Sequence, residues 1–170
     1  LYKSAGIEVG KVQISSAIHV PFDKLDDHER LEAFRELQAF EEDRYLHQTH
    51  ARTAGSHFYE DLSDAIKEFD GAPPPSAPWR VHFHVPIFLE RFGLLETTQD
   101  EVLDLLAVVQ EKTSCHHFEV ETYAWGVLPP ALRAENLSLG IADELLWLKE
   151  QTAKLATASS ESASDSGEQD

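Results

Sequence analysis

An α/β fold of parallel strands joined by crossover helices is predicted by the order of segments along the chain. Short runs rich in β-branched and aromatic residues span 10–17, 79–89 and 117–125, with a weaker run at 44–52. Segments with helical spacing lie between and after them, as in βα units. No glycine-rich phosphate loop follows a strand, so a nucleotide-binding doubly wound sheet is disfavoured. A complete (β/α)8 barrel needs roughly 250 residues, so these 170 residues correspond to about half a barrel.

Capping residues and apolar spacing predict four helices. Asp61 can cap one of them, Thr98 and Glu101 form a capping box for the next, and Asn136 or Ser138 begins the last. The first is an acidic, charged segment at 26–42. The side chains expected to face the core share the 3.6-residue period: Leu31, Phe34 and Leu37; Leu62, Ala65, Ile66 and Phe69; Val102, Leu105, Leu106 and Val109; Leu137, Ile141, Leu145 and Leu148.

The chain is expected to form one domain over residues 1–155, followed by a disordered tail. Residues 156–170 are small, polar and acidic, with no apolar period. The sequence contains no methionine, from which we expect a piece of a longer protein.

Composition excludes several function classes. The net charge is −17, which repels phosphate backbones and anionic lipid, so neither nucleic acid nor a membrane is an expected partner. No apolar stretch is long enough to span a bilayer and no signal peptide pattern begins the chain. One cysteine excludes an intramolecular disulfide framework. A cytoplasmic location is therefore expected.

Two strands break the pattern of a buried parallel sheet, whose strands should be almost continuously apolar. In 79–89 the side chains of His82 and His84 share one face, opposite valines and a phenylalanine. In 117–125 the polar face carries Glu119, Glu121 and Tyr123. Buried polar groups need partners, so the two polar faces are expected to converge. A single inward histidine is usually a hydrogen-bonded core residue, but two at this spacing beside two acids favour a functional site.

Two imidazoles and a carboxylate form the usual ligand set for a divalent ion such as Zn, Mn, Fe or Co. We therefore predict His82, His84 and Glu121 as metal ligands, with Glu121 also as the catalytic carboxylate. Substrate-binding residues are predicted at Gln13, which ends the first strand, and at Tyr123 and Trp125, which follow the strand of Glu121. A buried ion pair to a lysine or arginine is the alternative for Glu119.

Several phrases resemble the xylose isomerase-like barrel superfamily, which includes sugar phosphate isomerases and epimerases. They are GKVQISSA, RYLHQTHAR, WRVHFHVPIF, FGLLETTQDEV and FEVETYAWGVLP, and they are most similar to a branch linked to metabolite traffic. The resemblance covers residue 7 to about residue 149. It implies the C-terminal half of the barrel and a metal-ligating glutamate at Glu121. The superfamily commonly has a metal-binding histidine where this chain has Gln13, a departure from its standard metal site.

The resemblance implies metal-assisted isomerisation or epimerisation of a small, sugar-like metabolite, with other proteins of the same pathway as further partners. The alternative is a non-catalytic barrel that binds or carries a metabolite in an export pathway, which the glutamine at position 13 favours. A DNA-repair endonuclease of the same superfamily is disfavoured by the charge of −17.

Overall fold

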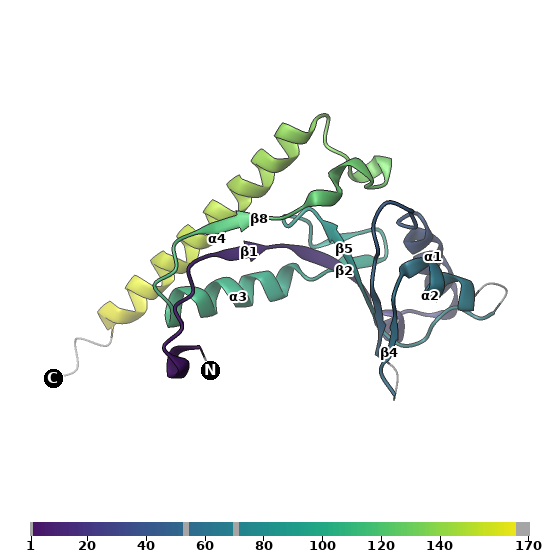
Figure 1. The fold of residues 1–170 in the computed structure, drawn as a ribbon, viewed down its shortest axis with the longest axis horizontal. Coiled ribbons are helices and arrows are strands. Elements are labelled where there is room, and N and C mark those ends of the chain that lie inside the picture. The colour runs from purple at the N-terminus through teal and green to yellow at the C-terminus, as the bar shows by residue number, and fades with distance from the viewer. Residues whose placement is uncertain (1, 53–54, 70–71, 166–170) are drawn as a thin grey trace.

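The computed structural model describes residues 2–52, 55–69 and 72–165, and its strands form two sheets. Six strands form a sheet in the order β4-β3-β5-β2-β7-β6, and all of its pairings are antiparallel. Two strands, β1 and β8, form a parallel pair (Figure 1). The strand bounds are β1 Val12–Ile14, β2 Ser16–Val20, β3 Thr49–Ala51, β4 His57–Tyr59, β5 Trp79–Val85, β6 Arg91–Phe92, β7 Leu95–Thr97 and β8 Phe118–Val120.

Four α-helices accompany these strands, and three of them, α1, α2 and α4, begin at a capping side chain. Asp26 caps the first helix within a capping box completed by Glu29, and Asp61 caps the second through the amide of Leu62. Asn136 accepts a hydrogen bond from the amide of Leu139 at the start of the fourth. The helix bounds are α1 Asp27–Gln38, α2 Leu62–Glu68, α3 Gln99–Lys112 and α4 Leu137–Asp165. Short 3-10 helices lie at Lys3–Ala5, Phe22–Lys24, Tyr123–Gly126 and Pro130–Leu132.

The prediction of half a (β/α)8 barrel, with parallel strands and crossover helices, is wrong. Strand β5 runs antiparallel to both neighbours, β2 and β3. The pairs β3–β4 and β6–β7 are hairpins. A hairpin reverses the chain within a few residues and so makes its two strands antiparallel, whereas a crossover helix would make them parallel. Gly93 forms the second turn with a φ of 59°, a left-handed conformation that favours glycine. Among the described strands, only β1 and β8 pair in parallel.

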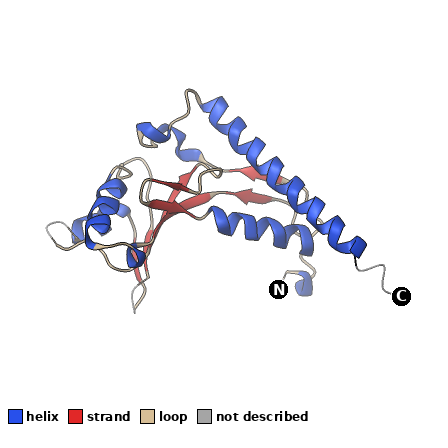
Figure 2. Cartoon of the chain, turned by 180° about the vertical axis from the view of Figure 1, so that it is seen from behind, coloured by secondary structure: helices blue, strands red, loops and turns tan. Residues whose placement is uncertain are grey.

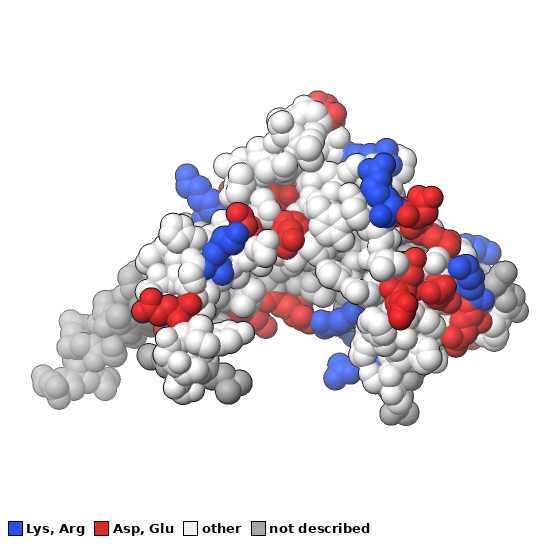
Figure 3. All heavy atoms as spheres, viewed as in Figure 1, with Lys and Arg blue, Asp and Glu red and all other residues white. Residues whose placement is uncertain are grey.

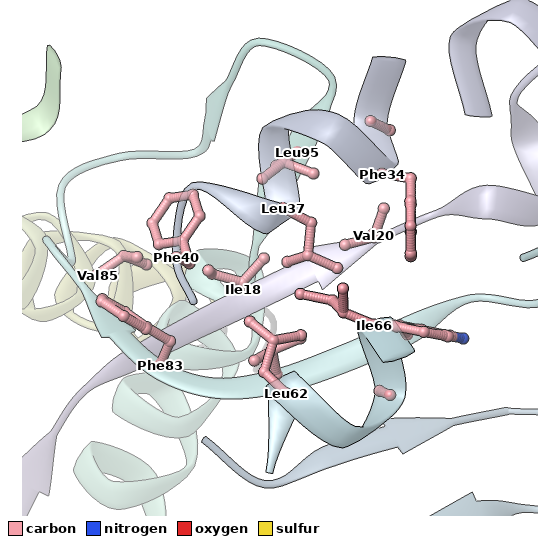
Figure 4. Packing of buried hydrophobic residues seen from close by; sticks show 14 of the residues in the cluster. Ile18, Val20, Phe34, Leu37, Phe40, Leu62, Ile66, Phe83, Val85 and Leu95 are labelled. Carbon is pink, nitrogen blue, oxygen red and sulfur yellow. The ribbon is translucent and has the colours of Figure 1, made fainter. Parts of the chain in front are cut away.

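The larger core lies between one face of the six-stranded sheet and helices α1 and α2. Figure 4 shows Phe34 and Leu37 of α1 and Ile66 of α2 pointing toward Ile18 and Val20 of β2. The ring of Trp79 is almost completely buried and packs edge-on against the ring of Phe22, with the ring centroids 5.6 Å apart. Aromatic packing of this kind contributes beyond the apolar area that it buries, so this core fixes the β5 face on which Val81, Phe83 and Val85 lie.

A second, smaller core joins the β1–β8 pair to helices α3 and α4. Figures 1 and 2 show both helices on one side of this pair, with α4 crossing it at an angle. The buried members are Ile14, Ile87, Val102, Leu106 and Leu148. The opposite side of the pair carries polar side chains, among which Lys11 and Glu119 form an exposed ion pair at 2.6 Å. Glu119 thus has the basic partner of the alternative prediction, but the ion pair is exposed rather than buried.

The rotation of α4 about its axis differs from the expected one. Of the four leucine and isoleucine side chains expected to face inward, only Leu148 is buried, while Leu137, Ile141 and Leu145 are exposed. Gly140 and Glu144 face the protein instead. The ring of Trp125 packs against the backbone at Gly140, where an added Cβ would lie 2.6 Å from Cη2. Hydrogen bonds to Glu144 hold the same face inward.

Two further helix predictions differ from the structure. The hydroxyl of Thr98 makes no cap on α3 and instead accepts a hydrogen bond from the amide of Ala17 at 2.9 Å. Glu101 forms an ion pair with Arg80 of β5. A contact with a distant strand therefore takes the place of the local capping box. Leu31 and Leu105 are about 40% exposed, so the inward stripes of α1 and α3 are narrower than predicted.

Residues 156–165 continue α4 rather than leaving the fold at once, while residues 166–170 lie outside the described residues. A separate disordered tail remains a prediction. Within the described segments, no helix combines the length and apolar character required to cross a bilayer. Figure 3 shows acidic and basic side chains mixed over the end of the molecule that carries α1 and α2.

The contact at Gly140 predicts a steric requirement for glycine in α4. Gly140→Ala should lower the free energy of unfolding by about 1–3 kcal/mol, because the new methyl group overlaps the Trp125 ring. Gly10→Ala is the control, since no atom lies within 4 Å of its added Cβ. Urea unfolding measures both variants. Equal stability of Gly140→Ala and the wild type would contradict the packing described here.

Candidate functional site

Alternation along strand β5 places two histidines on its polar face, next to an irregularity in its pairing with β2. The register between β2 and β5 shifts between Ala17, which pairs with His84, and Ile18, which pairs with Val81. Such irregularities re-aim side chains beside functional sites. The two imidazoles of His82 and His84 are drawn together, with ring centroids 4.9 Å apart and Nε2 atoms 2.9 Å apart. We call these two residues the histidine pair.

Oxygen acceptors fix the proton on the Nδ1 side of both rings. Nδ1 of His84 lies 2.5 Å from the backbone carbonyl oxygen of Glu121, and Nδ1 of His82 lies 3.0 Å from Oε1 of Gln48. A carbonyl or amide oxygen only accepts hydrogen bonds. Both Nδ1 atoms therefore donate, and in the neutral rings both Nε2 atoms carry a lone pair.

The geometry consequently brings two lone pairs face to face. His84 is 5% exposed, and burial lowers the pKa of its imidazole below the usual value, which keeps it neutral near pH 7. Two facing lone pairs repel unless a positive species lies between them. Either a second proton on His82 or a metal ion satisfies the pair. Fixing Nδ1 on an oxygen is also how metal-binding histidines are commonly oriented.

A divalent metal fits this donor set. At the usual Zn–N distance of about 2.0–2.1 Å, two nitrogens of a tetrahedral zinc site are about 3.3–3.4 Å apart, so the Nε2 atoms, which are 2.9 Å apart, would have to separate by roughly half an ångström to bind zinc together. Over residues 2–52, 55–69 and 72–165, no group of three or more His, Cys, Asp or Glu side chains is arranged around one ion position. The fitting set is thus two imidazole nitrogens, with the remaining positions left to water or a ligand.

Tyr123 packs against the histidine pair, and Tyr45 packs against Tyr123. The ring of Tyr123 lies 4.6 Å from that of His84 and 5.0 Å from that of Tyr45. Both tyrosines are about 40% exposed, so they form a rim rather than a closed wall. Burial raises the pKa of the Tyr123 phenol, and the negative charges of Glu121 and Glu42 add to the effect. The phenol therefore stays protonated and can donate a hydrogen bond to a ligand.

Glu121 contacts the histidine pair through its backbone carbonyl, and its side chain is not shown to be a metal ligand. Its carbonyl accepts the Nδ1 proton of His84, whereas its carboxylate belongs to no three-residue ligand group among the described residues. The carboxylate is close enough to raise the pKa of His84 against the larger effect of burial. Sequence reasoning placed the residue at the site but could not distinguish its two kinds of oxygen.

The other two predicted substrate-binding residues lie differently. Gln13 is exposed on β1 and lies opposite Glu119 in the parallel pair, without a described contact to the histidine pair. Trp125 is 7% exposed and donates from Nε1 to Glu144 at 3.1 Å. Its ring therefore packs under α4 instead of facing a ligand.

Sequence reasoning missed three contributors. Gln48 and Tyr45 lie before β3, in a loop that was assigned to a weak strand. Glu144 is fully buried in α4 and accepts hydrogen bonds from Ile87, Thr122 and Trp125. An acid among leucines on a helix was a usable signal for Glu144, since a buried carboxylate needs partners. Burial raises the pKa of Glu144, and the three hydrogen bonds oppose that rise.

The chain matches no protein-family model, no curated protein and no solved structure. The resemblance to the xylose isomerase-like superfamily therefore remains a prediction, and the histidine pair has to be interpreted from its own geometry.

A separate polar cavity of about 240 Å³ lies on the same face of the sheet. It is lined in part by His19, Arg80 and Glu96, which oppose one another across β5, β2 and β7. His19 lies 3.4 Å from Glu96, and Arg80 pairs with Glu101. Since these charges already have partners within the protein, the histidine pair is the stronger candidate for a functional site.

The buried imidazole of His47 has no hydrogen-bond partner among the described residues. It is 1% exposed, and neither ring nitrogen has a partner among the described residues. Its ring stacks on Phe83 at 4.4 Å. Glu42 Oε1 lies 3.5 Å from Nε2, within ion-pair distance, but makes no hydrogen bond with it. An unsatisfied buried polar group costs about 1–3 kcal/mol, so His47 destabilises the core.

Replacing His47 by phenylalanine should stabilise the protein. His47→Phe keeps the stack on Phe83 and removes two unsatisfied nitrogens, so the free energy of unfolding should rise by about 1–3 kcal/mol at pH 7. The measurement is urea unfolding. His116→Phe, at an exposed position, is the control and should leave stability nearly unchanged.

The same residue predicts a pH dependence. Burial lowers the pKa of His47 below its ordinary value of 6.5, although Glu42 and Asp61 oppose the shift. The unfolded state then binds more protons than the folded state below pH 6.5, so stability falls as the pH decreases from that value toward the lower folded pKa. In His47→Phe this fall should be smaller than in the wild type. Parallel stability curves would contradict the assignment.

Proposed function

We propose that this protein binds a divalent metal ion between His82 and His84 and uses it to hold a small, oxygen-rich metabolite of the sugar or polyol type. The observation that carries the proposal is the pair of Nε2 atoms 2.9 Å apart, with both Nδ1 atoms on oxygen acceptors. A bound ion would polarise the oxygen atoms of the metabolite and place them in its open coordination positions.

The surroundings of the histidine pair support a cation and a polar ligand. The net charge of −17 attracts cations to the protein in general. Two protein nitrogens leave most coordination positions open, unlike a closed structural zinc site with four protein ligands. The partly exposed ring of Tyr123 lies beside His84, with Tyr45 next to it, and the protonated phenol of Tyr123 can donate to a ligand oxygen.

Binding and turnover place different demands on the residues. For binding, His84 is held by the carbonyl of Glu121 and His82 by Gln48. An isomerase or epimerase reaction also needs a base. Glu121 is the carboxylate that affects the pKa of both His84 and Tyr123, so it is our candidate for that role.

Metal binding is tested by titrating Zn²⁺ into chelator-treated protein in a calorimeter. We expect about one ion per chain, and a loss of at least about tenfold in affinity in His82→Ala and in His84→Ala. His50→Ala is the matched control, because His50 lies on β3 opposite Arg80 and its Nε2 contacts Ser56 rather than the pair. Unchanged affinity in both variants of the pair would contradict the proposal.

The alternative positive species is a proton shared by the two rings. If Zn²⁺ does not bind, nitrogen NMR of the histidine pair should show His82 protonated on both nitrogens and donating to His84. That result would replace the metal proposal. The metabolite part is tested by adding sugars and polyols to zinc-loaded and metal-free protein and following the ring signals of Tyr123. Equal shifts without zinc would favour the metal-independent carrier.

A further inference from the structure

Glu144 is the most deeply buried carboxylate among the described residues, and the binding proposal gives it no role. It is 0% exposed, and its partners are all uncharged donors. Oε1 accepts from the amide of Ile87 at 3.2 Å and from the hydroxyl of Thr122, and Oε2 accepts from Nε1 of Trp125 at 3.1 Å. Burying a carboxylate without a cation is costly. The three hydrogen-bond donors are therefore needed to offset that cost, and apolar side chains could not take their place.

The positions of these donors connect Glu144 to the histidine pair. Ile87 follows His84 by three residues along the segment that leaves β5, and Thr122 follows Glu121 directly. The hydrogen bond between Nδ1 of His84 and the carbonyl of Glu121 joins the same two segments. One carboxylate oxygen thus ties together the two chain segments that carry the donor and the acceptor of that bond.

The link through Thr122 is direct, because the carbonyl of Glu121 belongs to the peptide group that joins it to Thr122. Holding the Thr122 side chain restricts the rotation of that planar group. Trp125, in the 3-10 helix that begins at Tyr123, is held by the second carboxylate oxygen and by its packing on Gly140. Helix α4 therefore holds the segment that follows the acceptor at two points, Thr122 and Trp125.

We propose that Glu144 is a positioning residue for the histidine pair: from α4 it holds the Glu121 carbonyl where it keeps the proton of His84 on Nδ1 and leaves Nε2 free to bind a metal ion. The proposal rests on the proposed function for its consequence in metal affinity, but its structural half concerns the metal-free protein. A carboxylate has two oxygens that only accept, so Glu144 satisfies all three donors at once. An amide in its place would present an N–H₂ group to at least one of them.

The experiment compares Glu144→Gln with Asp143→Asn. Both variants remove one acid from adjacent positions of α4, but Asp143 is exposed. Nitrogen NMR of the metal-free proteins gives the tautomer of His84, and Zn²⁺ calorimetry gives the affinity. We expect Glu144→Gln to populate the Nε2–H tautomer and to bind Zn²⁺ about tenfold more weakly. Asp143→Asn should match the wild type in both.

Thr122→Val is the second variant, since it removes one donor hydroxyl and keeps the shape of the side chain. We expect the same change of tautomer and the same loss of zinc affinity, so Thr122→Val tests the proposal if Glu144→Gln does not fold. A folded Glu144→Gln protein with the wild-type tautomer and wild-type affinity would overturn the positioning role. A changed tautomer in a protein that binds no zinc in any form would support Glu144 as a positioning residue and reject the metal-binding function.

Discussion

Strand β5 has to bury one face and keep the other polar, and most of the structure follows from that division. One face of β5 belongs to the larger core through Val81, Phe83 and Val85, and helices α1 and α2 pack on this core. The alternate residues cannot be apolar in the same way, because they face the side of the sheet that carries no helix of that core. The strand pairs with β2 on one side and β3 on the other, so its polar face is held rigidly at the centre of the sheet.

Contacts from outside the strand explain why the two imidazoles meet. Side chains two residues apart on a regular strand stand side by side at roughly 7 Å, which is too far for their ring nitrogens to share one small species unless the rings lean together. The rings tilt toward each other for two reasons. The strand register shifts opposite Ala17 and Ile18, and each ring is hydrogen-bonded to an outside acceptor, Gln48 or the Glu121 carbonyl. The histidine pair therefore depends on three segments that are far apart in the sequence.

The placement of His82 and His84 together could be predicted from the sequence, but the positions of Gln13 and Trp125 and the directions of the strands could not. Alternation along residues 79–89 correctly put His82 and His84 on one face, because side-chain direction in a strand is a local property. The direction of the strands is not local. The β6–β7 hairpin has strands of two and three residues, too short to show a period, and missing it turned an antiparallel sheet into a predicted parallel one. The prediction of which face of α4 points inward was also wrong. Apolar spacing does not show that Glu144 accepts hydrogen bonds from three donors in other segments.

The small number of protein donors has a consequence for the kind of site this can be. A structural zinc site closes four protein ligands around the ion and contributes directly to folding. Here two nitrogens lie on a strand already fixed by a core of aromatic and aliphatic side chains, so the fold does not need an ion to form. An ion bound there, as proposed, would keep most of its coordination positions for other oxygen or nitrogen atoms, and how long it stays would depend on what fills them. Such a site would depend on the exact placement of the two imidazoles rather than on the number of ligands, and that placement is what the surrounding structure maintains.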